Sequence, residues 1–224
     1  MAYTLLKQLL EQVEAFEQLS QGGAGSAAPD LAGFAAWLYG RTAAPPAPRG
    51  PSAPATVPSM PPEAEIGKLL IFLTRYARSY IRLGLAGTPL LTPDDFAYLA
   101  TVMGHQPISK TELIARNIHE KATGTEVIKR LLARGLVQEQ PHATDRRSKL
   151  LSITEAGGAV LGLVFGPMGQ ASQLIAGDLT RAERIQLLYL LKKLDAFHLP
   201  IFQEGRAGSF SDLLQHLPDN NPAA

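Results

Sequence analysis

A proline-rich segment from residue 43 to residue 62 is the feature that most constrains the fold. Eight of these twenty residues are proline, and most of the others are alanine or serine. Proline lacks a backbone N–H and clashes with the preceding helical turn, so no regular helix or internal strand can run through the segment. We interpret it as an extended linker and expect an N-terminal helical extension (1–42), a main domain (63–202) and a C-terminal tail (203–224).

The N-terminal extension contains two stretches with helical periodicity. Apolar residues recur every three or four positions from about Tyr3 to Leu19, which predicts a first helix. Asp30 is a favourable N-cap for a second, short helix, in which Phe34 and Trp37 share one face. Two roles stay open for the first helix: an additional dimer contact, or an arm that binds a partner.

The main domain begins with a long amphipathic helix over about residues 63–86. The next helix has a full start signal, because Thr92 is a good N-cap and Pro93 suits the first helical position. Asp94 and Asp95 then lie where the positive end of the helix dipole favours acidic residues. These signals predict two consecutive helices.

Two further helices are predicted between the helix that starts at Thr92 and Gly135. Ser109 and Glu112 have the spacing of a capping box, which indicates a helix start. A longer helix follows over about residues 119–134, and Gly135 ends it. We assign its inward side to Ile118, Ala122, Thr125, Ile128 and Leu132.

A basic turn joins two short extended segments, 136–140 and 149–153. Two strands separated by a polar loop predict a hairpin, and the tip of this one carries Asp145, Arg146 and Arg147. Helix, helix, helix, strand, basic loop and strand follow in the order of a winged helix-turn-helix with a two-stranded wing. The predicted class is therefore a mainly α protein in which the winged helix is flanked by long helices with apolar faces, which we expect to form a dimer interface.

This arrangement suggests a nucleic-acid interface. A helix fits the major groove, and an arginine at a wing tip suits the negative minor groove. Gly124 is costly inside a helix, by about 1 kcal/mol against alanine, and a close approach to DNA would explain it. Backbone donors at the start of the preceding helix suit a phosphate. The candidate DNA contacts are Ser109, Lys110, Lys121, Thr123, Gly124, Thr125, Lys129, Asp145, Arg146, Arg147 and Lys149.

Charge is concentrated in the same region. The whole chain has a net charge of +1, so long-range attraction to DNA by the molecule as a whole is not expected. Between residues 110 and 149, however, nine Lys or Arg face five acidic residues, a surplus of four. The local surplus supports a DNA-binding patch. A winged-helix module that binds protein instead of DNA is the alternative, and the salt dependence of duplex binding discriminates the two.

Other classes of function have little support. The chain has no cysteine, which excludes disulfides and thiol-based redox sensing. No phosphate-binding glycine loop, nucleophile elbow or acid–base pair indicates an enzyme, and the five histidines lack the spacing of metal ligands, so no cofactor or metal is expected. The N-terminus lacks the apolar core of a secretory signal, and no stretch reaches the roughly 18 apolar residues that span a bilayer. We therefore expect a cytoplasmic protein.

The motifs from residue 111 to residue 157 resemble the MarR (multiple-antibiotic-resistance regulator) family of bacterial transcription factors. The most specific part is the pattern of Asp145, Arg147, Lys149, Thr154 and Gly157. The resemblance implies a homodimer on a palindromic DNA operator, acting as a repressor, and a possible small-molecule effector whose pocket is unknown. The residues expected at the dimer interface are Ile66, Leu69, Leu70, Leu73, Leu187, Leu191, Leu194 and Phe197. Tyr76 and Tyr80 are candidates to line an effector cavity, although buried packing is the preferred interpretation.

Overall fold

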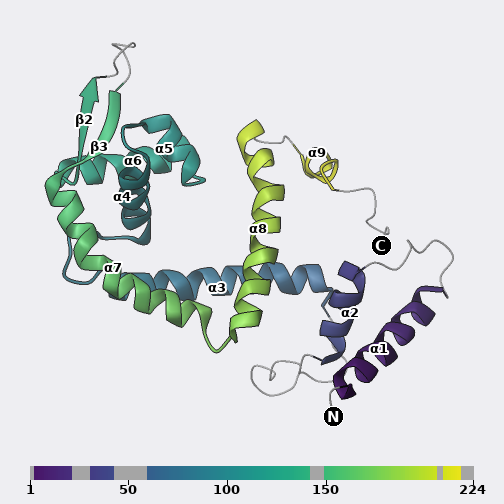
Figure 1. Ribbon diagram of the computed structural model, residues 1–224. Helices are drawn as coiled ribbons and strands as arrows, with labels where there is room; N and C mark the ends of the chain where they lie inside the picture. The colour runs from purple at the N-terminus through teal and green to yellow at the C-terminus, as the bar shows by residue number, and fades with distance from the viewer. Residues whose placement is uncertain (1–2, 22–30, 43–59, 142–148, 206–208, 218–224) are drawn as a thin grey trace. The chain divides into compact units, whose positions relative to one another are not determined.

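The computed structural model describes residues 3–21, 31–42, 60–141, 149–205 and 209–217 (Figure 1). The chain divides into two compact units, Met1–Ser59 and Met60–Ala224. We describe each unit by itself. The linker that the proline content predicts lies almost wholly outside the described residues, and so does the Asp30 cap.

The N-terminal unit is a pair of helices, as the periodicity predicts. Helix α1 spans Thr4–Gln21 and α2 spans Leu31–Thr42. An aromatic cluster joins them, because the ring centroid of Phe16 lies 5.6 Å from those of both Phe34 and Trp37. Such tilted ring pairs contribute packing energy beyond the area that they bury.

The second unit is mainly helical and contains the predicted winged helix. Its elements, in chain order, are α3 (Pro62–Gly84), α4 (Pro93–His105), β1 (Ile108–Ser109), α5 (Lys110–Arg116), α6 (Lys121–Ala133), β2 (Val137–Pro141), β3 (Lys149–Ile153), α7 (Glu155–Ala176), α8 (Arg181–Glu204) and α9 (Phe210–Leu214). The predicted fold class is confirmed.

The helix start signals are mostly confirmed in detail. Thr92 caps α4, and its reciprocal bond with Asp95 completes a capping box. The Ser109 hydroxyl caps α5 by accepting from the Glu112 amide at 3.1 Å. Glu112 differs from the prediction, because its carboxylate accepts a hydrogen bond from Arg116 at 2.9 Å. The carboxylate therefore forms a local i,i+4 pair with Arg116 and does not accept the hydrogen bond from the backbone amide of Ser109 that would complete a capping box.

The wing belongs to a three-stranded antiparallel sheet in the order β1-β3-β2. Strands β2 and β3 form the predicted hairpin, with Val137 opposite Ile153 and Pro141 opposite Lys149. The sequence did not predict β1, which pairs Ile108 with Leu151 on the other side of β3. A strand of two residues carries too little alternation of apolar and polar residues to be recognised by period.

The core of this unit lies between α4, α5, α6, the sheet and the first turns of α7. Tyr98, Leu113, Ile128, Leu151 and Leu161 are among its fully buried side chains. These residues come from five separate elements. They therefore hold the helix-turn-helix, the wing and α7 in one packed body.

The first turn of α7 packs directly on the chain that leaves α6. The Thr154 hydroxyl accepts from the Gly157 amide and donates to the Gly135 carbonyl at 2.6 Å. A Cβ on Gly157 would come within 2.1 Å of the Leu136 carbonyl oxygen. The Thr-x-x-Gly pattern after the wing thus has a packing explanation, because a side chain at Gly157 would push α7 away from the core.

The expectation that no stretch is long and apolar enough to span a bilayer is wrong for α7, which passes that test by length and composition. The helix is continuous through Pro167. Its buried side chains, including Val160, Leu161 and Val164, belong to the winged-helix core. Further along, α7 crosses α3 closely, because a Cβ on Gly84 would meet the Met168 side chain at 2.3 Å. Packing inside the protein therefore accounts for part of the apolar character of this helix, whereas Leu163 and Leu174 are exposed.

Candidate nucleic-acid interface

Helix α6 presents one face to solvent and buries the other. Gly124, Val127, Ile128 and Leu131 are buried. The exposed face carries small polar and charged residues near the N-terminus of the helix: Lys121, Ala122, Thr123, Glu126 and Lys129. This is the distribution of side chains that a helix needs to enter a DNA groove while it remains packed on its own domain.

Gly124 lies on the buried face of α6, which corrects its predicted role. A Cβ at this position would come within 2.5 Å of the Ile114 side chain and 2.6 Å of the Tyr98 hydroxyl oxygen. The glycine therefore permits close packing of α6 on α4 and α5, not a close approach of DNA. Two residues assigned to the inward side, Ile118 and Ala122, are exposed instead, whereas Thr125 is half-buried.

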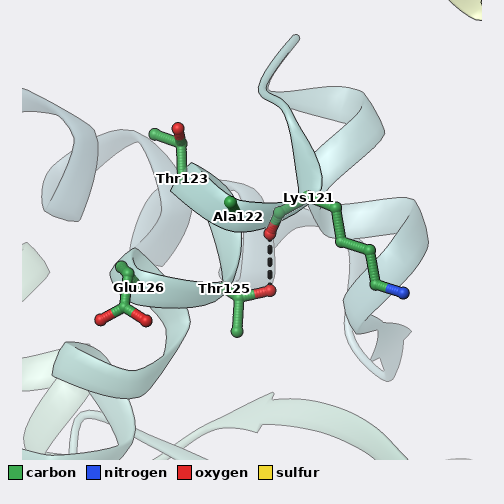
Figure 2. Close-up of a pocket in the computed structure, with 5 residues that line it drawn as sticks. All are labelled: Lys121, Ala122, Thr123, Thr125 and Glu126. Atoms are coloured by element: carbon green, nitrogen blue, oxygen red, sulfur yellow. Dashed lines mark hydrogen bonds between the residues drawn. The ribbon is translucent and has the colours of Figure 1, made fainter.

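A shallow hollow of about 700 Å³ lies along the exposed N-terminal half of α6 (Figure 2). Its lining residues are Lys121, Ala122, Thr123, Thr125 and Glu126. Figure 2 shows the Lys121 side chain extending away from Thr123 and Glu126. The Thr125 hydroxyl donates to the Lys121 carbonyl at 2.6 Å, so its hydrogen is already engaged within the helix.

A buried carboxylate fixes α6 on α4. Asp95 is fully buried, and its Oδ1 accepts from Nε and Nη2 of Arg130 at 3.0 and 2.6 Å. Arg134 Nη1 lies 3.5 Å from Oδ2 of the same residue. The sequence identified Asp95 as a favourable first-turn acid. It did not reveal the pairing, because Asp95 and Arg130 are 35 positions apart.

The start of α6 is tied to α4 by a second contact. The Tyr98 hydroxyl lies 3.1 Å from His119 Nδ1, and the two rings stack with centroids 5.6 Å apart. Burial, followed by the nearby Asp94 carboxylate, raises the pKa of Tyr98 to about 12. The phenol is therefore protonated at neutral pH and takes part in this hydrogen bond as a neutral group.

The candidate lysines differ in whether a carboxylate already binds them. Lys129 pairs with Glu126 at 2.7 Å, and Lys110 and Lys149 both pair with Glu139. Lys121, among these four described lysines, has no carboxylate partner. Its ammonium is therefore available to a phosphate without breaking an internal ion pair.

The predicted wing tip, Asp145, Arg146 and Arg147, lies outside the described residues. The strands that lead to it are described up to the pair Pro141 and Lys149. The phosphate contact expected near Ser109 and Lys110 stays a prediction. In the structure, the Ser109 hydroxyl caps α5 and the Lys110 ammonium pairs with Glu139.

No residue of the two helices expected to form a dimer interface, α3 and α8, is fully buried within the described chain. Of the eight proposed interface residues, Leu69 and Phe197 are half-buried and six are exposed: Ile66, Leu70, Leu73, Leu187, Leu191 and Leu194. Tyr76, for which we preferred buried packing, is also exposed, and lines a hollow of about 210 Å³ on α3 with Phe72 and Arg75.

An ion pair connects α3 with the DNA-binding part. Both terminal nitrogens of Arg78 donate to the two carboxylate oxygens of Asp94 at 3.0 Å, a bidentate arrangement. The Arg78 guanidinium holds the pKa of the Asp94 carboxyl below its ordinary value. Asp94 thus joins the start of α4 to α3, while the next residue, Asp95, joins it to α6.

Together, the packed three-helix core, the exposed face of α6 and the β2–β3 hairpin define a winged helix-turn-helix protein of the DNA-binding class. A family model described as MarR family matches residues 91–148. The transcriptional repressor NicR of Pseudomonas putida is 39% identical over 106 residues, which cover 47% of this chain and 67% of NicR. The regulator HosA of Escherichia coli is 28% identical over 107 residues, 78% of its length.

Solved structures agree with these relatives. The chain is similar to BpsR of Bordetella bronchiseptica, from work on regulation of its DNA binding by 6-hydroxynicotinic acid, with a TM-score of 0.55, 27% identity and coverage of 58% of this chain and 98% of BpsR. It is also similar to an Escherichia coli MarR variant complexed with operator DNA, with a TM-score of 0.55, 25% identity and coverage of 60% and 99%. The chain belongs to the MarR family and is a DNA-binding regulator of transcription.

Proposed function

We propose that the protein is a homodimeric, sequence-specific repressor that binds a palindromic DNA operator. The observation that carries the proposal is the exposed N-terminal half of α6, where Lys121 and Thr123 project from a helix whose other face is buried. Short polar and cationic side chains on a rigid helix suit the edges of bases in a major groove.

The wing supplies the second contact in this proposal. Arg147 enters the minor groove beside the site of α6, where the narrow, negative groove attracts a guanidinium. Asp145 orients Arg147 within the loop. The β2–β3 pairing supports this role, because it carries the hairpin up to the pair Pro141 and Lys149.

The dimer is inferred from uncovered apolar surface. Residues such as Leu70 on α3 and Leu191 on α8, both 41% exposed, lie on helices in which no residue is fully buried within the chain. Exposed apolar side chains that recur along a helix are typical of interfaces. A two-fold axis through them places two copies of α6 about one helical turn of DNA apart.

We infer in addition that a small molecule regulates DNA binding, and that the protein acts in the cytoplasm, where a bacterial chromosome lies. The similarity to BpsR makes 6-hydroxynicotinic acid the first compound to test. Repression is inferred from the similarity to NicR. Titration of the compound against a preformed protein–DNA complex tests the effector, and transcription in vitro from a promoter with the operator tests repression.

Selection of bound sequences from a pool of random duplexes tests the proposed function as a whole. We expect one palindromic sequence to be enriched, a complex with two protein chains per duplex, and affinity that falls steeply with salt. Each phosphate neutralised contributes about 0.9 to the slope of log K against log salt. A flat salt dependence would instead favour a winged-helix module that binds protein. Sedimentation of a single chain at micromolar concentration would exclude the dimer.

A further inference from the structure

Glu139 binds two lysines that come from different elements. Lys110 Nζ lies 2.5 Å from Oε1 of Glu139, and Lys149 Nζ contacts Oε2. Lys110 is the first residue of α5, Glu139 lies in the middle of β2, and Lys149 opens β3. One carboxylate therefore connects the helix-turn-helix to both strands of the wing.

The register of the sheet explains why these three residues meet. Pairing of β1 with β3 ends at Ser109 opposite Leu150, so the next residue, Lys110, comes level with Lys149. Glu139 pairs with Leu151 on β3 and is thus a diagonal neighbour of Lys149. Two ammonium groups at the same level would repel each other. The Glu139 carboxylate compensates both.

The three side chains differ in exposure in a way that suits competition with an external anion. Glu139 is 22% exposed, whereas Lys110 and Lys149 are 44% and 61% exposed. Lys110, followed by Lys149, holds the pKa of the Glu139 carboxyl below its ordinary value, so the group is ionised at neutral pH. The ammonium groups of Lys110 and Lys149 are therefore accessible to solvent, whereas the Glu139 carboxylate that binds them is half-buried.

Neighbouring ion pairs have a different arrangement. Arg116 pairs with Glu112 and Lys129 with Glu126, each within a single helix and at a spacing of four or three residues. Such local exposed pairs contribute little and exchange readily. The cluster of Glu139, Lys110 and Lys149 instead lies at the root of the wing and joins elements that must contact DNA together.

We propose that Glu139 limits the affinity of the protein for DNA, because it occupies Lys110 and Lys149 in the free protein and must release them before they bind the backbone phosphates of a duplex that engages α6 and the wing together. The inference rests on the proposed function, in which these lysines contact DNA. Displacement of Glu139 opposes these phosphate contacts whatever the base sequence. Glu139 therefore weakens binding to random and operator duplexes alike.

The test compares full-length wild type with Glu139→Gln and with a matched control, Glu112→Gln. Both variants lose one carboxylate, but Glu112 pairs with a single arginine of its own helix. Binding is measured across a salt series to the selected operator duplex, to a 30-base-pair random duplex and to heparin. Thermal unfolding verifies that the variants fold, and Glu139→Asp, which keeps the charge but has a shorter reach, replaces Glu139→Gln should the latter unfold.

We expect Glu139→Gln to bind the random duplex about tenfold more tightly than Glu112→Gln does, with a salt slope steeper by about 0.9 to 1.8, which corresponds to one or two more phosphates. The operator duplex is bound more tightly as well, because the wild-type protein must displace Glu139 there too. The proposal is overturned if Glu139→Gln matches Glu112→Gln on both duplexes, if it binds the random duplex more weakly, or if its operator affinity does not rise.

Failure of the proposed function is distinguishable from failure of this inference. If wild type binds no duplex, the proposed function is wrong, and heparin, a polyanion without bases, still reports on the lysines. Elution of Glu139→Gln from heparin at higher salt than Glu112→Gln then supports the role of Glu139 in occupying them. Equal elution overturns it.

Discussion

Arg130 on α6 donates two hydrogen bonds to a single carboxylate oxygen of Asp95, which is fully buried on α4. Asp95 Oδ2 in turn accepts from the backbone amides of Leu91 and Thr92, so the same side chain closes the start of α4. The orientation of the proposed recognition helix is therefore coupled to the start of the helix before it. A buried ion pair of this kind stabilises a structure when its remaining polar atoms are also bonded.

Asp95→Ala should destabilise the domain strongly. Removal of one partner from a buried pair leaves the other charge uncompensated, which costs about 3 to 5 kcal/mol. We expect the lower end, because the Arg130 side chain keeps 34% exposure. Urea unfolding measures the change. Glu126→Ala, which removes one partner of an exposed pair on α6, should change stability far less, and equal losses for the two variants would contradict this account.

Gly124→Ala separates the structural role of this glycine from a DNA contact. Alanine gains about 1 kcal/mol of helix propensity over glycine. Overlap with Ile114 and Tyr98, however, costs about 1 to 3 kcal/mol. We expect a net loss of unfolding free energy. Gly162→Ala on α7, where nothing lies within 4 Å of the added carbon, should be neutral or stabilising. A Gly124→Ala protein that is more stable than wild type would show that the added carbon does not overlap with Ile114 and Tyr98.

Arg147→Ala should weaken operator binding and leave the dimer intact. The loss follows from the minor-groove contact proposed for the wing, and we expect about 1 to 3 kcal/mol, as for one specific contact. Fluorescence anisotropy at fixed salt measures affinity, and sedimentation measures assembly. Arg181→Ala on α8 removes the same charge away from the wing and serves as control. Equal operator affinity for Arg147→Ala and wild type at matched salt would remove the wing from the interface.

Asp94 should make stability depend on pH in the acid range. Its pKa is lowered by the hydrogen bonds from Arg78, relative to an ordinary value of 3.8. The stabilisation is therefore fully present above that value and is lost as pH falls through the lower pKa of the folded state. Both side chains are partly exposed, so we expect about 1 kcal/mol or less. In urea unfolding, the difference between wild type and Asp94→Asn should be largest near pH 6 and shrink below about pH 4.

Helix starts, helix ends and the order of elements followed directly from local chemistry. Thr92 with Pro93 predicted the start of α4, Gly135 predicted the end of α6, and two short extended segments joined by a polar loop predicted the β2–β3 hairpin. These signals are readable because each acts within a few residues through capping, backbone conformation or period. The spacing from Asp145 to Gly157 was sufficient to indicate the family.

The rotation of α6 and the partners of its charges depended on tertiary structure. Helical period alone placed Gly124 outward and Ala122 inward, whereas packing against Tyr98 and Ile114 sets the reverse. Glycine and alanine have too little apolar surface to mark a face, so contacts from distant elements decide.

The ion pairs between elements also depended on tertiary structure and not on local sequence. Local sequence determined where helices begin and end, and also the concentration of basic residues around the wing. Only the folded chain brought Asp95 to Arg130, and Glu139 to Lys110 and Lys149. The physical reason is that capping and periodicity act over a few residues, whereas a pairing across 35 or 29 positions exists only once the sheet register and the helix packing have brought the side chains together.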